Sequence, residues 1–234
     1  MQFASMRAMH AFISNANAQG GFHNSPTLYC PLYELADETV AAVELSPAVL
    51  RSRLLPGFSH AKALLRGEHA LFAKDAFACV RLGTRELADR EAPARLLRAV
   101  RDMDQDAARF CLFFSDSLCK ALGFRTIEQL MSFKRSGFRL GIDIDSLDAA
   151  AGPFLEMLPA DVLRLGALDT VALTSDPDGA AELASFTHFA DNLLMIPAAS
   201  GVRNRAQLSM LRQTGMRFGQ GPLFPPHSER LAIV

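Results

Sequence analysis

The chain has 234 residues, a length typical of one α/β barrel, which can run to about 250 residues as a single domain. Half of the residues are hydrophobic, enough for a sizeable core, and the net charge of −1 gives no basic field that would favour nucleic acid or an anionic membrane. No apolar run approaches the ~20 residues needed to span a bilayer, and the four scattered cysteines indicate free thiols in a reducing compartment. We therefore expect a cytoplasmic protein with no membrane segment and no nucleic-acid partner.

Residues 1–25 are expected to form a helical or flexible leader, and residues 26–234 a single domain. In that domain short apolar runs alternate with amphipathic segments, a pattern that favours a parallel sheet with crossover helices. The expected strands are Thr27–Leu35, Val40–Ser46, Phe77–Gly83, Arg109–Asp116, Phe138–Asp145, a part of Phe154–Leu168, Leu193–Ile196 and a part of Met216–Phe224. The expected helices are 48–70, Glu86–Met103, Thr126–Ser136, Ala180–Phe189 and one after Asn204.

The last predicted helix has clear signals at both ends. A small-residue turn, Ala198–Gly201, is expected before it, and Asn204 can cap its first turn. Gln207 stands three residues later, where a capping-box partner belongs, and Gly215 ends the helix at a position that favours a left-handed residue. Strand, loop, helix and strand within about 30 residues predict a βαβ unit.

Several motifs in this order resemble the EAL family, bacterial phosphodiesterases of cyclic di-GMP. The C-terminal end keeps Gln207-Leu208, Gly215 and Gln220-Gly221, and Glu44-Leu45-Ser46 stands where the family has its Glu-Ala-Leu signature. The resemblance covers roughly residues 27–226. It implies a TIM-like (β/α)8 barrel of the EAL type, with an opening hairpin that makes the first strand antiparallel.

The resemblance also implies a site for two metal ions, which the family holds with acidic and amide side chains. On this chain the six ligand positions are Glu44, Arg81, Phe113, Asp143, Ile144 and Ser200, and the two assisting positions are Arg164 and Gln220. Two of the six ligands therefore remain. Two like unit charges ~4 Å apart repel by about 4 kcal/mol at an effective dielectric constant of 20, so Arg81 opposes a dication there. We expect Glu44, Asp143, Arg164 and Gln220 to form a vestigial pocket that holds no metal or cofactor and catalyses nothing.

The two retained carboxylates are expected to form salt bridges with Arg81 and Arg164 in a buried pocket. Gln220 is interpreted as a hydrogen-bonding residue at the mouth of the barrel. The alternative is a partly rebuilt metal site that uses Asp145 or Asp116, because Asp145 shares a strand face with one retained carboxylate.

These substitutions favour a degenerate, non-catalytic EAL-like regulator that acts by contact with another protein, as in the control of motility or biofilm formation. The alternative is a cyclic di-GMP receptor without hydrolysis, with Arg81, Arg164 and Gln220 as the nucleotide-binding residues. Cys30 replaces a glutamine, and Pro47-Ala48 stand in place of the family's Leu-Arg pair, whose arginine contacts the ligand phosphate; both changes argue against that receptor. An active phosphodiesterase is the third hypothesis. The partner, a homodimer and the role of residues 1–25 stay open.

Overall fold

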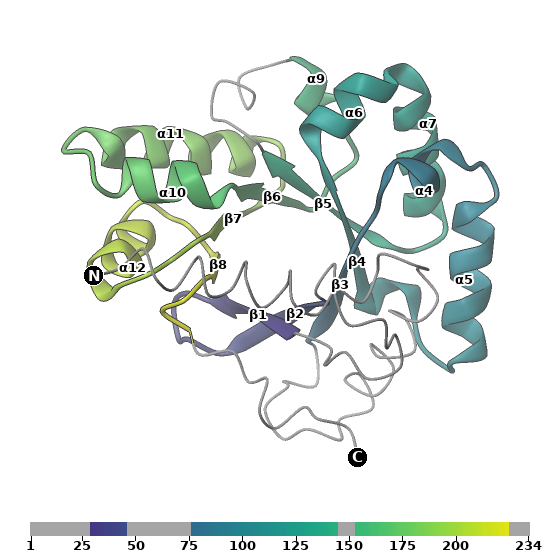
Figure 1. The fold of residues 1–234 in the computed structure, drawn as a ribbon, viewed down its shortest axis with the longest axis horizontal. Coiled ribbons are helices and arrows are strands. Elements are labelled where there is room, and N and C mark those ends of the chain that lie inside the picture. Colours follow the sequence, from purple (N-terminus) through teal and green to yellow (C-terminus); the bar gives the residue numbers. More distant parts are fainter. Residues whose placement is uncertain (1–28, 46–75, 145–152, 225–234) are drawn as a thin grey trace, which may run out of the picture.

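A computed structural model describes residues 29–45, 76–144 and 153–224. In these residues the chain forms a closed barrel in which strands β1 to β8 follow one another in sequence order (Figure 1). The predicted (β/α)8 barrel is therefore confirmed. The strands are β1 (Tyr29–Glu34), β2 (Val40–Leu45), β3 (Phe77–Arg81), β4 (Phe110–Ser115), β5 (Arg139–Ile144), β6 (Val162–Leu165), β7 (Ile196–Ser200) and β8 (Phe218–Gln220).

Helices lie outside the barrel and connect its parallel strands. Figure 1 shows α10, α11 and α12 along one side of the sheet and α4 to α7 along the other. The helices are α4 (Thr84–Ala88), α5 (Ala92–Asp102), the 3-10 helix η1 (Ala107–Arg109), α6 (Asp116–Leu122), α7 (Phe124–Arg135), α9 (Pro153–Glu156), α10 (Ala167–Leu173), α11 (Gly179–Asn192) and α12 (Arg205–Gln213). None of the helices in the described ranges is long and apolar enough to cross a bilayer.

The first strand runs against its neighbours, as predicted. Strand β1 pairs antiparallel with β2 and with β8, whereas each step from β2 to β8 is parallel. In the β1–β2 turn, Asp37 accepts hydrogen bonds from the backbone and hydroxyl of Thr39, and Glu38 has a positive φ of 58°. This hairpin sets the register that brings Cys30 opposite Glu44.

Two apolar clusters stabilise the barrel. The larger one lies between the strands and the surrounding helices, as expected when alternate strand residues face outward. The smaller one fills the barrel interior and consists of Leu32, Ala42, Phe77, Cys79, Cys111, Phe113, Val162, Ala198 and Phe218. The interior is therefore a packed core, and polar chemistry is confined to its ends.

The predicted strand at Leu193–Ile196 is wrong, because the strand lies later, at Ile196–Ser200. Leu194 has a positive φ of 58° and is 92% exposed, so it belongs to the turn that ends α11. Ala198 and Ala199 are fully buried in β7, in the place of the predicted small-residue turn. At these positions the small side chains fit a crowded part of the sheet. The sequence pattern alone does not distinguish such a strand from a turn.

The predicted helix Glu86–Met103 is also wrong, because it divides into α4 and α5. Asp89 has an extended backbone (φ −96°, ψ 110°), and Pro93 lies in the first turn of α5, where its missing N–H is tolerated. The cap of the last helix is confirmed: Asn204 accepts from the Gln207 amide, and Gly215 has φ 87°.

Some sequence predictions fall outside the described residues. They concern the leader at 1–25, the helical stretches at 48–70 and residues 145–152. The proposed domain boundary at residue 26 therefore stays a prediction.

Candidate functional site

The site lies at the C-terminal ends of the parallel strands, the end at which barrels of this kind place their polar side chains. Five residues from five strands meet there: Glu44 from β2, Arg81 from β3, Asp143 from β5, Arg164 from β6 and Gln220 from β8. Strand alternation directs one residue in two toward the barrel axis, so each of these side chains points to the same small volume.

The four charged residues alternate in a closed ring, which we call the four-charge ring. Arg164 Nη1 lies 2.6 Å from Glu44 Oε2, and its Nε lies 2.5 Å from Asp143 Oδ1. Arg81 Nη1 lies 2.6 Å from Asp143 Oδ2, and its Nη2 donates to Glu44 Oε1 at 3.3 Å. Each carboxylate thus contacts both guanidinium groups. The pairing predicted from the sequence is confirmed.

Arg164 is the buried centre of the ring, with only 2% of its surface exposed. Its N–H groups donate to Asp143 once, to Glu44 twice and to Gln220 once, so these hydrogen bonds use four of the five N–H groups of the guanidinium. Arg81 differs, because 37% of its side chain is exposed at the rim. Arg164 is therefore the fixed half of the ring and Arg81 the solvent-facing half.

An aromatic ring packs against the guanidinium of Arg164. The Arg164 guanidinium carbon lies 4.2 Å from the centre of the Phe113 ring, a cation–π contact. Phe113 in turn lies over Gly141, where an added Cβ would come within 2.5 Å of the aromatic ring. Phe113 and Arg164 therefore fit each other, and Gly141 leaves the room that they need. Sequence reasoning took Phe113 only as a lost ligand position and missed this stack, although a glycine inside a strand signals a close approach.

The charges explain the protonation states of the ring. Burial alone would raise the pKa of Glu44, but Arg164 and, to a lesser extent, Arg81 outweigh it and lower that pKa from 4.5 to about 2. Burial would lower the pKa of Arg164, but Glu44 and Asp143 outweigh it and raise that pKa well above its usual value. Glu44 and Arg164 are therefore both charged at neutral pH.

The remaining predicted positions are not all directed into the ring. Ile144 belongs to the outer apolar cluster, on the face of β5 opposite Asp143. Ser200 ends β7 beside Gln220, whose side-chain amide donates to the Cys30 carbonyl at 3.1 Å. The prediction that Gln220 forms hydrogen bonds at the mouth of the barrel is therefore confirmed, whereas its partner on β1, the Cys30 carbonyl, was not predicted.

The alternative metal ligands have different surroundings. Asp116 begins α6, is buried, and forms an ion pair with Lys120 at 2.8 Å. Asp145 lies outside the described residues. Within the described ranges no group of three or more His, Cys, Asp or Glu side chains is placed to hold a metal ion.

The sequence that forms this barrel also matches a known protein family. The model of the EAL domain matches residues 36–227. The chain belongs to the EAL domain family. No curated protein matches the chain.

Solved EAL structures share the fold at low sequence identity. The EAL domain of Mycobacterium smegmatis DcpA is 17% identical, with a TM-score of 0.74, and the match covers 87% of this chain and 94% of that one. The Xanthomonas citri FimX EAL domain in complex with cyclic di-GMP is 16% identical, with a TM-score of 0.70 and coverage of 93% and 94%. The EAL enzyme Bd1971, bound to cAMP and cyclic di-GMP, is 19% identical, with a TM-score of 0.72 and coverage of 98% and 69%.

Proposed function

We propose that this protein is a degenerate EAL-domain regulator that does not hydrolyse cyclic di-GMP and acts by contact with another protein in bacterial signalling. The observation that carries the proposal is the four-charge ring. Two-metal phosphodiester hydrolysis needs two cations about 3.5–4 Å apart, held largely by carboxylates. Here both carboxylates of the site are already held by two arginines each.

The residues present do not fit a pair of divalent cations. A cation between Glu44 and Asp143 would have to displace Arg164, which is buried, hydrogen-bonded on several sides and stacked on Phe113. Arginine keeps its proton and cannot relieve the repulsion by becoming neutral. Phe113 also offers no oxygen. The ring therefore supports a site that is closed to metal, and we derive no catalytic step from it.

A receptor for cyclic di-GMP that does not hydrolyse it is the second candidate, because Arg81 is partly exposed at the rim of the barrel. Its guanidinium could turn toward a phosphate. Arg164 contributes little to this candidate function, since hydrogen bonds within the site already occupy four of its five N–H donors. The FimX EAL domain bound to cyclic di-GMP gives the receptor hypothesis its structural precedent at the level of the fold.

Calorimetric titration with cyclic di-GMP, with and without Mg²⁺ or Mn²⁺, tests the proposal, with product analysis on the same samples. We expect neither heat nor product. Saturable binding without turnover would establish the receptor, and Arg81→Ala would then weaken binding more than Arg98→Ala on α5, a matched exposed arginine. Linear product would overturn the proposal.

A further inference from the structure

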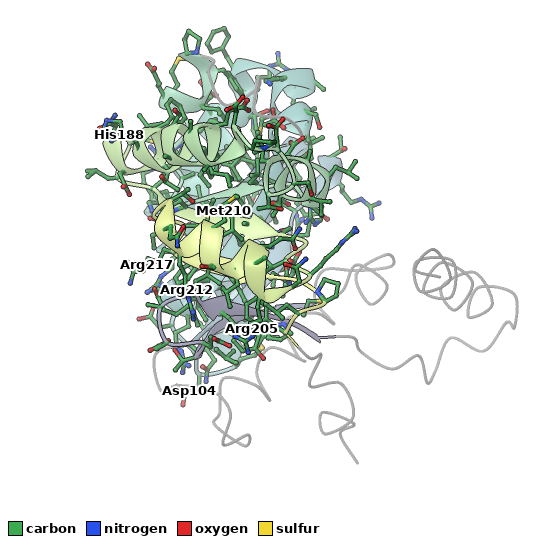
Figure 2. All side chains as sticks on the ribbon, turned by 90° about the vertical axis from the view of Figure 1, so that its left-hand side faces the viewer. Asp104, His188, Arg205, Met210, Arg212 and Arg217 are labelled. Atoms are coloured by element: carbon green, nitrogen blue, oxygen red, sulfur yellow. The ribbon has the colours of Figure 1, made fainter. Side chains whose placement is uncertain are left out.

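The charged side chains of this protein are unevenly distributed along the chain. Residues 192–228 contain four of its 24 Lys and Arg residues and none of its 25 Asp and Glu residues. All four are arginines, and all are exposed on or beside α12: Arg203, Arg205, Arg212 and Arg217. We call this surface the arginine face. Figure 2 shows Arg205, Arg212 and Arg217 along the β1 side of α12, with Met210 toward the opposite side.

The side chains of the arginine face remain accessible although some are already paired. Arg205 is 68% exposed and Arg217 is 57% exposed at the side chain. Arg205 and Arg212 share one oxygen, Glu38 Oε1, at 2.6 and 3.1 Å, and Arg217 Nε lies 3.2 Å from Glu34 Oε2. Two carboxylates of the β1–β2 hairpin thus pair with three of the four arginines, so the arginine face keeps a net positive charge and spare N–H donors.

Glu38 shows how a carboxylate fits this surface. Arg205 and Arg212 are seven residues apart on α12, so they lie on one side of the helix about 10 Å apart. Between this row and Met210 the exposed side chains are uncharged, and two of them are short: Ala206, Ser209 and the longer Gln213. A second helix could approach closely there and place acidic residues at a spacing of seven beside the arginines.

We propose that the arginine face is a docking surface for an acidic helix of a partner protein. The inference rests on the proposed function, because it names the surface by which a protein-contact regulator would bind. Arginine suits this role, since its planar group binds carboxylates in a bidentate geometry and it is enriched at interfaces. The short side chains of α12 let the partner helix lie against it while its carboxylates reach the outer N–H groups.

The same surface fits other polyanions less well. Proteins that bind duplex DNA tightly neutralise about 6–10 phosphates, whereas four arginines beside Glu34 and Glu38 offer fewer free charges. A helix that lies on a membrane needs large apolar side chains next to its basic residues, and the exposed face of α12 has none of the aromatic or leucine residues that serve this purpose.

The probe for the test is an alanine-based helical peptide of about 20 residues with glutamate repeated along one side. Anisotropy measures its binding to the full chain at about 50 and about 200 mM NaCl, beside a glutamine version, a DNA duplex and phosphatidylserine vesicles. We expect saturable, salt-sensitive binding of the glutamate peptide, about tenfold tighter than that of the glutamine peptide and tighter than that of the other two polyanions.

Charge reversal locates the binding. Arg205→Glu with Arg212→Glu should weaken the glutamate peptide by about tenfold or more and gain binding of an arginine version of it. Arg98→Glu with Arg101→Glu, the same charge change on α5, should leave binding within about twofold. Arg205→Gln with Arg212→Gln serves as the milder variant if the reversed one fails to fold.

Several outcomes overturn the docking surface: no saturable binding of the peptide to the wild type, equal binding by both double variants, or tighter binding of DNA or vesicles. None of them depends on the titration with cyclic di-GMP. If only the peptide test fails, the docking surface is refuted and the proposal of a non-catalytic regulator is unaffected. If cyclic di-GMP is hydrolysed, the proposed function is refuted, and the peptide test can still be interpreted.

Discussion

Replacing Arg164 by methionine should be strongly destabilising, although methionine fills a similar volume. Arg164 is buried and is the only residue of the four-charge ring that also stacks on Phe113. Its loss leaves Glu44 and Asp143 buried against Arg81 alone. Removal of one partner from a buried ion pair costs about 3–5 kcal/mol, because the remaining charge has lost its compensation. For a chain of this size that loss lowers the melting temperature by roughly 6–20 °C.

The control is Arg95→Met on α5. Arg95 and Asp89 form an ion pair at the same distance as Arg164 and Glu44, 2.6 Å, but their side chains are 53% and 34% exposed. Exposed pairs contribute about 0–1 kcal/mol, so the control should change the melting temperature by only a few degrees. Urea unfolding followed by circular dichroism gives the free energies for both variants.

A second substitution separates charge from packing. If unpaired charge is the cause, Glu44→Gln in the Arg164→Met background should recover about 1 kcal/mol or more relative to the sum of the single changes. Equal losses for Arg164→Met and Arg95→Met would refute the reasoning, because burial of the ring would then have no energetic consequence. Strict additivity of Glu44→Gln and Arg164→Met would refute it as well.

Three further changes test the charge of the ring, the packing of Phe113 and the cap of α12. Glu44→Gln removes a carboxyl whose pKa falls from 4.5 to about 2 on folding. The carboxyl therefore stabilises the folded state above pH ~4.5, and this stabilisation is lost as the pH falls toward 2. In urea titrations the difference in unfolding free energy between wild type and variant should shrink by about 3 kcal/mol over that range. Gly141→Ala would bring a Cβ within 2.5 Å of the Phe113 ring and should cost about 1–3 kcal/mol by thermal unfolding, with partial recovery when Phe113→Leu is added. Asn204→Ala removes the cap of α12 and should cost about 1 kcal/mol, with faster amide exchange at Gln207 than in Ser209→Ala.

The order of elements was predictable because it depends on local pattern. The β1–β2 hairpin, the alternation of strand and helix and the cap at Asn204 follow from residues close together in the chain. The displaced strand β7 was not predictable in this way. Its residues are small, and Ala198 is fully buried because β7 faces the packed interior of the barrel. That crowding comes from distant strands and leaves no periodic signal.

The candidate site was predictable in its charges and not in its packing. Two retained carboxylates and two arginines at strand ends must meet at one end of a barrel, so their pairing followed once the fold was assumed. The stack of Arg164 on Phe113 over Gly141 needed the register of three neighbouring strands. Each of these residues looks like an independent substitution in the sequence, and the structure couples them.

The arginines of the arginine face should affect association with a partner, whereas those of the four-charge ring should not. The formal charges of the four-charge ring sum to zero, so the ring attracts no partner from a distance. The arginine face keeps an excess of positive charge at exposed side chains. Rim charges mainly change the rate of association and its dependence on salt. In stopped-flow measurements Arg205→Gln should therefore slow association with the acidic peptide and make the association rate less dependent on salt. Arg81→Gln should leave both the rate and its salt dependence unchanged. Equal effects of the two changes would mean that the barrel mouth is the binding surface.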